Sequence, residues 1–315
     1  MLEFEKPIVE LERAIARLEK ISKEKHLDYS ERLTKLRERL EERKRVVFSN
    51  LSPWQKVELA RCSDRPHTAD YIKVLIEDFV ELHGDRYAGD DPAIIGGLGK
   101  FDGKSIVIIG HQKGKDTKEN LARNFGMAHP EGYQKALRLM KLAERFYIPV
   151  VTLIDTPGAH PGIEAEERGQ AKAIAENLME ISSLRTPIIC IIIGEGGSGG
   201  ALGIGLADRI LMLENSIYSV ISPEGCAAIL WKSQDAKKEA AKALKLTASD
   251  LLQMKIIDEV IEEPLAGAHR DAKRTIDNVK EALKESLERL NRIPIDQLLE
   301  LRYEKYRKMG AFKEE

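Results

Sequence analysis

Two apolar runs, each followed by a turn of small residues, constrain the fold more than any other feature of this chain. Residues 149–154 have the sequence Pro-Val-Val-Thr-Leu-Ile, and residues 187–193 have the sequence Pro-Ile-Ile-Cys-Ile-Ile-Ile. Strands that are this continuously apolar are typical of parallel sheets covered by helices on both faces. Amphipathic helical patterns surround both runs, so we predict an α/β protein.

A strand–strand–helix order precedes the first of these runs. Residues 94–101 and 105–110 are strand-like, and Asp102-Gly103 between them is a strong signal for a tight hairpin turn. A helix is expected to follow over residues 130–146. The spacing of apolar residues also predicts a helix over residues 68–83.

Both ends of the chain are predicted to be helical. Apolar stripes within residues 8–47 predict an antiparallel helical hairpin, and the charged tail carries two further amphipathic patterns. We therefore expect a helical hairpin over residues 1–60, a main domain over 61–268 and a C-terminal helical segment over 269–315. The other expected elements are a helix over 163–184, strands over 209–213, 218–222 and 256–261, and helices in most of the chain after residue 224.

Composition excludes several classes of function. Lys and Arg total 50 against 52 Asp and Glu, and aromatic residues make up 5%, which argues against a dedicated nucleic-acid binder. The three cysteines lie far apart and form no CxxC pair, so we expect reduced thiols and no metal site in this chain. The N-terminus lacks the apolar core of a signal peptide, and no apolar run is long enough to span a membrane. A cytoplasmic protein is expected.

The strongest chemical signal is a glycine-rich turn after the second apolar run. Residues 194–201, which we call the glycine cradle, have the sequence Gly-Glu-Gly-Gly-Ser-Gly-Gly-Ala. Five glycines in eight residues let a backbone approach a ligand closely, and the helix predicted to follow begins with free N–H groups. The segment therefore predicts a site for an anion or an oxyanion.

A second segment, residues 155–162, follows the first apolar run with the sequence Asp-Thr-Pro-Gly-Ala-His-Pro-Gly. It ends a buried strand at the edge of the sheet where ligands bind in α/β proteins. The basic loop that contains Lys113, Lys115, Lys118 and Arg123 is interpreted mainly as solvated surface, with a phosphate-bearing ligand as the minority interpretation.

Three short patterns point elsewhere. Gly194-x-Gly196-x-x-Gly199, with Glu214 about twenty residues on, fits a dinucleotide fingerprint, although the helix after it is predicted to be short. Gly196-x-Ser198-x-Gly200 fits a nucleophile elbow, but only one histidine follows the serine. Gly103-Lys104-Ser105 lacks the first glycine of a phosphate-binding loop, because Leu98 stands there.

Longer stretches carry a family resemblance that is much more specific than these patterns. The stretches are 109–114 (IGHQKG), 123–127 (RNFGM), 130–133 (PEGY), 135–140 (KALRLM), 155–162 (DTPGAHPG), 166–170 (EERGQ), 194–201 (GEGGSGGA), 218–226 (YSVISPEGC), 229–232 (ILWK) and 263–269 (EPLAGAH). Together they resemble the carboxyltransferase α subunit of multi-subunit, bacterial or plastid-type acetyl-CoA carboxylase, over nearly the whole chain. His160 stands where Tyr is common in that family.

The resemblance implies a crotonase-like fold, in which strand-strand-helix units wind into a spiral, with a helical hairpin before it and helices after it. It also implies transfer of CO2 from carboxybiotin on a separate biotin carboxyl carrier protein to acetyl-CoA. The product is malonyl-CoA, in the first committed step of fatty acid synthesis. The implied partner is a β subunit with a zinc ribbon in an α2β2 assembly, so the metal is expected on the partner.

The resemblance further implies that this subunit holds biotin. Backbone N–H groups can stabilise the negative charge that grows on the ureido oxygen, so no catalytic side chain is required. We expect the N–H groups of Gly199, Gly200 and Ala201 to be the donors. Gly196 and Gly197 are expected to shape the biotin pocket, and Gly158 and Ala159 to line its opposite wall. Replacing Gly200 by Val is expected to crowd the biotin and leave assembly intact.

Three other interpretations stay open from the sequence. A biotin-independent acyl-CoA hydratase or decarboxylase of the same fold would need a side chain in the site, and Glu195 is the carboxylate within the cradle. A nicotinamide-dependent oxidoreductase would use the dinucleotide pattern. A non-catalytic scaffold would use the N-terminal hairpin as its contact surface.

Overall fold

The structure is a computed structural model and describes residues 2–310. Its centre is one eight-stranded sheet, with the order β1-β2-β3-β4-β5-β6-β8 and with β7 paired to β5. The strands are β1 (Glu77–Glu81), β2 (Ile94–Phe101), β3 (Lys104–His111), β4 (Val150–Thr156), β5 (Ile188–Gly197), β6 (Arg209–Leu213), β7 (Ile217–Ser219) and β8 (Glu259–Ile261). The β1–β2 and β2–β3 pairs are antiparallel, and the pairs from β3 onward are parallel.

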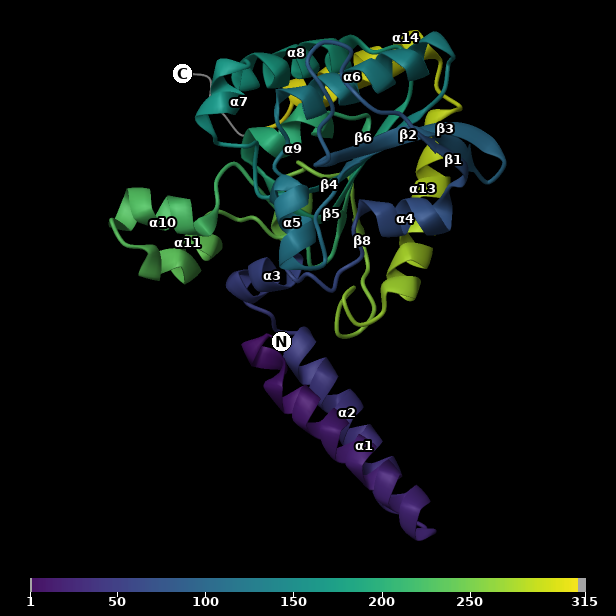
Figure 1. Ribbon diagram of the computed structural model, residues 1–315, viewed down its shortest axis with the longest axis vertical. Coiled ribbons are helices and arrows are strands. Elements are labelled where there is room, and N and C mark those ends of the chain that lie inside the picture. The colour runs from purple at the N-terminus through teal and green to yellow at the C-terminus, as the bar shows by residue number, and fades with distance from the viewer. Residues whose placement is uncertain (1, 311–315) are drawn as a thin grey trace.

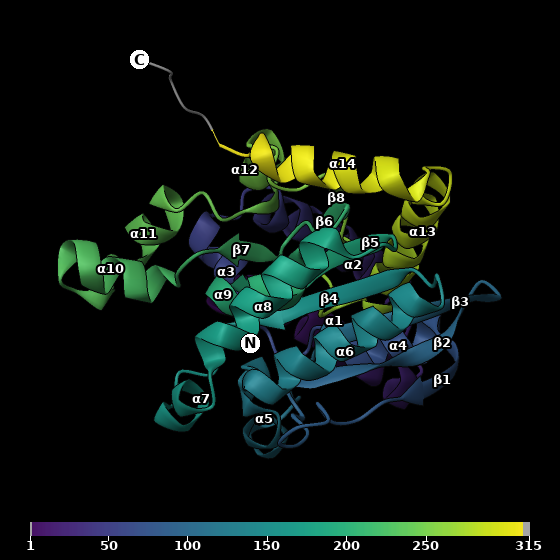
Figure 2. The same ribbon diagram turned by 90° about the horizontal axis from the view of Figure 1, so that it is seen from above.

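Helices cover both faces of the sheet (Figures 1 and 2). One face packs against α4 (Thr68–Leu75) and α13 (Ala272–Leu290), and the other against α6 (Pro130–Arg145), α8 (Gln170–Ser183) and α9 (Ser198–Gly205). Strand β5 shows why the sequence needs both layers. Its odd-numbered isoleucines 189, 191 and 193 belong to the α4/α13 core, while residues 188, 190 and 192 belong to the α6/α8 core. Side chains that alternate across a strand bury both faces, which explains the unbroken apolar run.

Three groups of helices lie outside these two layers. The hairpin of α1 (Lys6–Lys25) and α2 (Ser30–Phe48) projects away from the sheet, and α10 (Pro223–Trp231) and α11 (Lys237–Ala243) form a lobe at one side (Figure 1). Helix α14 (Ile295–Arg307) runs beside α8. The shorter helices are α3 (Pro53–Ala60), α5 (Thr117–Ala122), α7 (Ile163–Glu167), α12 (Ala248–Gln253) and the 3-10 turns Glu3–Glu5, Asn124–Gly126 and Gln234–Ala236.

Several predicted elements are confirmed. The helical hairpin, the strand-strand-helix order of β2, β3 and α6, and the two buried parallel strands β4 and β5 all form. Asp102 and Gly103 turn the β2–β3 hairpin with φ values of 47° and 73°, which suits a tight turn between twisted strands.

Two predicted helices are wrong in part. The helix expected over residues 68–83 ends at Leu75, and Glu77–Glu81 form the edge strand β1 instead. A Cβ on Gly97 of β2 would lie 2.1 Å from the carbonyl oxygen of Val80, so only glycine lets β1 pair there. The helix expected over residues 163–184 is broken into α7 and α8 by Gly169, whose φ is 85°. The strand expected over residues 218–222 is Ile217–Ser219, because Ser222 caps α10.

Candidate functional site

The glycine cradle lies where β5 turns directly into α9. Ser198 makes this turn with a φ of 51°, a left-handed conformation that is unusual for a residue other than glycine. Gly199 and Gly200 are the second and third residues of α9, so their N–H groups precede the first i→i−4 bond of the helix, whereas the N–H of Ala201, the fourth residue, reaches back to the carbonyl of Gly197. The first turn of a helix leaves such donors free and carries the positive end of the helix dipole. The cradle therefore offers a set of donors to a negative atom.

The opposite wall is formed by residues 157–159, which follow β4. A Cβ on Gly197 would lie 2.1 Å from the carbonyl oxygen of Pro157, and a Cβ on Gly200 would lie 2.3 Å from the carbonyl carbon of Gly158. The two backbones are thus in direct contact, and the chain can make this contact only with glycine at both positions.

The structure brings most of the predicted site residues to this place. Gly197 and Gly200 contact the wall at Gly158 and Ala159, and Gly199 and Ala201 complete the first turn of α9. Gly196 serves a different contact. A Cβ there would lie 2.8 Å from the Cδ2 atom of Tyr218, so this glycine makes room for β7.

The expected reason for the effect of a valine at Gly200 is wrong. Its missing side chain points at the backbone of Gly158 and Ala159, not into ligand space. Gly199 is the open position, since a Cβ there would have Ile174 Cδ1, at 3.7 Å, as its closest neighbour. A substitution at Gly200 would therefore move the two walls apart.

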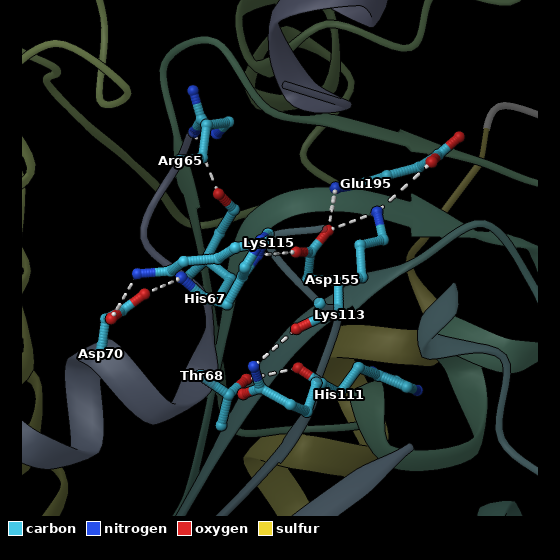
Figure 3. Close-up of polar contacts among 12 residues, drawn as sticks. Arg65, His67, Thr68, Asp70, His111, Lys113, Lys115, Asp155 and Glu195 are labelled. Atoms are coloured by element: carbon cyan, nitrogen blue, oxygen red, sulfur yellow. Dashed lines mark hydrogen bonds and ion pairs between the residues drawn. The ribbon is translucent and has the colours of Figure 1, made fainter. Parts of the chain in front are cut away.

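Beside the cradle lies a buried charged cluster (Figure 3). Asp155, near the end of β4, accepts hydrogen bonds from Lys113 Nζ at 2.7 Å, from His67 Nδ1 at 3.1 Å and from the backbone N–H of Glu195 at 3.1 Å. Burial alone would raise the pKa of Asp155, but Lys113 and His67 outweigh it and hold that pKa far below its usual range. For Lys113, burial opposes the charge, and Asp155 and Glu195 raise its pKa above the ordinary value. Asp155 and Lys113 are thus an ion pair at neutral pH.

Glu195 does not present a free carboxylate to the cradle. It is 5% exposed, and its side chain accepts a hydrogen bond from Arg61 at 2.8 Å and lies 3.5 Å from Lys113 Nζ. Arg61 also binds Glu224 at the start of α10, at 2.6 Å. A carboxylate held between two cations is a poor general base, which weakens the hydratase interpretation.

Two buried histidines adjoin the cluster. His111, at the end of β3, is fully buried, and burial lowers its pKa to about 4. His67 Nε2 and both ring nitrogens of His111 have no hydrogen-bond partner within residues 2–310. His160 follows the wall residues 157–159 and is stacked on His129 with 3.9 Å between ring centroids, and burial lowers its pKa. The hydrogen bonds of His67, His129 and His160 within residues 2–310 do not include Ser198, so none of these three is a histidine paired with the serine of the nucleophile-elbow pattern.

Residues 2–310 contain neither a metal-ligating cluster nor a helix that could cross a bilayer. No group of three or more His, Cys, Asp or Glu side chains is arranged to hold a metal ion in this part of the chain. No helix there combines the length and the apolar character that crossing a bilayer requires.

Comparison with known proteins places the whole chain in one family. Residues 1–310 match the family described as acetyl co-enzyme A carboxylase carboxyltransferase-like. The chain belongs to this family. The acetyl-coenzyme A carboxylase carboxyl transferase subunit alpha of Methylococcus capsulatus is 55% identical over 99% of this chain and 98% of that protein. The corresponding subunit of Thermus thermophilus is also 55% identical, over 99% of each chain.

Solved structures share the fold at low sequence identity. A transcarboxylase 12S with methylmalonyl-coenzyme A bound has a TM-score of 0.58 and 20% identity, over 71% of this chain and 41% of that one. This carboxyltransferase family member therefore spans less than half of the transcarboxylase chain. A Pseudomonas malonate decarboxylase hetero-tetramer in complex with coenzyme A has a TM-score of 0.57 and 17% identity, over 68% of this chain and 86% of that one. These likenesses confirm the crotonase-like fold class.

The sequence predicted the cradle of this carboxyltransferase but missed the charged cluster beside it. The sequence assigns Lys113 to a solvated loop and predicts no role for Arg61 or His67. One signal could have pointed to the cluster: Asp155 ends a buried strand, where a charged side chain needs a partner. The partner itself could not be chosen, because Lys113 is one of several lysines in its loop.

Proposed function

We propose that this chain is the α subunit of an acetyl-CoA carboxylase and acts only together with a β subunit. The pair would move a carboxyl group from carboxybiotin, carried on a biotin carboxyl carrier protein, to acetyl-CoA and so form malonyl-CoA for fatty acid synthesis. The observation that carries the proposal is the first turn of α9, with the N–H groups of Gly199 and Gly200 ahead of the first helical bond and Ala201 next to them, in a chain of this family.

The cradle fits the ureido ring of biotin. It offers hydrogen-bond donors, its carboxylate Glu195 is bound by Arg61 and lies 3.5 Å from Lys113, and the space beside Gly199 is open. Biotin, when bound, supplies a ring that carries the carboxyl group on nitrogen and whose oxygen gains negative charge as that group leaves. The N–H groups of α9 would donate to this oxygen, and one such donor stabilises a growing charge by about 3 kcal/mol.

The wall would hold the ring from the other side. Gly158 and Ala159 would contribute only backbone and a methyl group to this side of the ring. Gly197 would allow the turn to approach the wall, and Gly196 would support it through Tyr218. No side chain of this chain needs to accept a proton in this scheme.

The relatives are named as alpha subunits, which supports a β subunit as the partner of this chain. A β subunit would hold the acetyl thioester opposite the cradle, in an α2β2 assembly. We expect the zinc ribbon on that β subunit, and the carrier protein to deliver biotin between the two subunits.

The test is the reverse half-reaction, in which malonyl-CoA loses its carboxyl group to free biocytin. The chain is co-purified with the β subunit encoded by the same source, and zinc in the preparation is measured. We expect breakdown of malonyl-CoA that requires biocytin and both subunits.

Two results would overturn the proposal. Breakdown of malonyl-CoA without biocytin would indicate a biotin-independent decarboxylase of the same fold instead. Absence of malonyl-CoA breakdown, in a preparation that contains the zinc-bearing β subunit, would refute the proposed carboxyl transfer.

A further inference from the structure

The ladder between β4 and β5 is irregular next to the cradle. Ile154 pairs with Ile192, but the next pair is Thr156 with Gly196, so β5 uses two more residues than β4 over this step. Extra residues in a bulge lose their regular backbone partners, and buried N–H groups need another acceptor. The N–H of Glu195 finds that acceptor in the side chain of Asp155, at 3.1 Å.

Asp155 therefore connects the two walls of the site. Its own backbone leads within three residues to Pro157 and Gly158, which form one wall. Its carboxylate holds the backbone of Glu195, two residues before Gly197, where the other wall begins. The backbone of β5 packs closely against this carboxylate, since a Cβ on Gly194 would lie 2.5 Å from Asp155 Oδ1.

The charge of Asp155 is held in place by Lys113. The two side chains are 4% and 14% exposed, so water contributes little to solvating either one. Lys113 reaches Asp155 from the loop after β3, and that loop is itself fixed: Gly114 N–H donates to Asn120 Oδ1 and Gln112 Oε1 accepts from Ala69. A buried carboxylate without this partner would draw in water or a proton.

We propose that Asp155 is a positioning residue that sets the spacing between the glycine cradle and the wall at residues 157–159, with Lys113 holding it in its ionised form. The inference rests on the proposed function for its effect on turnover. It concerns the charged cluster and not the N–H donors themselves.

Three variants and one matched control test the inference. Asp155→Ala removes the acceptor for Glu195, and Asp155→Asn keeps an acceptor oxygen and removes the charge. Lys113→Met removes the partner charge and keeps the stem. Lys135→Met is the control, because Lys135 is a buried lysine that binds Asp90 and the carbonyl of Asp91, away from the cradle.

The expected readout is a change in kcat without a change in KM for malonyl-CoA. A shift of about 1 Å between walls reduces turnover by about 100-fold, which we expect for Asp155→Ala in the reconstituted enzyme. Asp155→Asn should recover part of that loss, because the amide oxygen can still accept from Glu195. KM should stay within about twofold, since the thioester is held by the partner subunit.

Lys113→Met should add a new acid limb to the pH profile of kcat. The groups that face Asp155 are His67 and Arg65 before α4, Tyr71 on α4, His111 on β3, Lys113 after β3 and Glu195 on β5. Without Lys113 the pKa of Asp155 rises, so activity should fall as the pH is lowered and Asp155 takes up a proton. The wild-type enzyme and Lys135→Met should show no such limb.

Amide hydrogen exchange of the α subunit provides a measurement that does not depend on turnover. We expect residues 195–201 to exchange faster in Asp155→Ala than in Lys135→Met. If the wild type turns over and Asp155→Ala matches it in kcat and exchange, the positioning role is refuted. If the wild type does not turn over at all, the proposed function fails, and faster exchange in Asp155→Ala would still support the connection between the walls.

Discussion

The backbone of Gly200 rests on the backbone of Gly158, so close that a Cβ on Gly200 would lie 2.3 Å from the Gly158 carbonyl carbon. This contact joins the first turn of α9 to the segment that follows β4. It places the first turn of α9 against a wall with no side chain between them.

The contact predicts different effects for two neighbouring glycines. Gly200→Ala should lower the free energy of unfolding by about 2–3 kcal/mol, because the methyl group must displace backbone. Gly199→Ala should leave stability unchanged or raise it slightly, because its Cβ has open space and alanine favours the helix. Urea unfolding of both variants measures the difference, and equal midpoints would contradict the contact.

The sequence predicted those parts of the fold that depend on local pattern. The alternating cores of β5, the Asp102-Gly103 turn and the meeting of residues 155–162 with 194–201 all follow from strand periodicity and from the geometry of parallel sheets. Strand β1 could not be predicted in this way. Its residues have a helical spacing, and only the glycines of the distant β2 make pairing there favourable.

The charged cluster beside the cradle also could not be predicted from local sequence pattern. Its members come from separate segments around residues 61–67, 113, 155 and 195, and no spacing in the sequence relates them. Buried charges find partners through the tertiary fold, so the residue types are visible in advance but their pairing is not.

Breaking a second buried ion pair, between Arg65 and Glu263, is expected to destabilise the fold strongly. Arg65 and Glu263 are almost fully buried and share two hydrogen bonds, at 2.7 Å and 3.0 Å. Glu263→Gln leaves the guanidinium charge without its partner, which should lower the free energy of unfolding by about 3–5 kcal/mol. Glu259→Gln is the control. Glu259 pairs with Arg209 and is 33% exposed, so its loss should be below about 1 kcal/mol in the same urea titration.

His111 predicts how stability depends on pH. Its pKa is about 4 in the folded chain against 6.5 when it is unperturbed, because the ring is buried. Between these values the unfolded chain binds more protons, so the contribution of His111 is complete above pH 6.5 and is lost as the pH falls toward 4. The loss approaches about 3 kcal/mol.

A phenylalanine at this position checks the assignment. His111→Phe keeps a ring in the core and cannot titrate, so its stability should fall less than that of the wild type between pH 6.5 and 4.5. Urea midpoints measured across this range give the comparison, and parallel curves would show that other groups cause the pH dependence.

The contacts of Glu5 are expected to stabilise the packing of the N-terminal hairpin against the rest of the chain. It is 3% exposed and accepts hydrogen bonds from His269 Nε2 at 3.0 Å and from Arg270 Nε at 2.8 Å. Burial opposes the charge, but these bonds outweigh it and lower the pKa of Glu5 to about 2. The stabilisation is therefore present above pH 4.5 and is lost as the pH falls toward 2.

Glu5→Gln should release the hairpin at neutral pH and leave the main sheet intact. The expected loss in the free energy of unfolding is roughly 2 kcal/mol. This is less than the full pKa shift of Glu5 implies, because the ion pair lies where the hairpin meets the rest of the chain. Glu3→Gln is the matched control, since Glu3 is 88% exposed and its ion pair with Lys6 adds little. Limited proteolysis should cut residues 49–52, between α2 and α3, faster in Glu5→Gln than in Glu3→Gln. Equal cleavage rates in the two variants would mean that the packing of α1 against the rest of the chain does not depend on the Glu5 carboxylate.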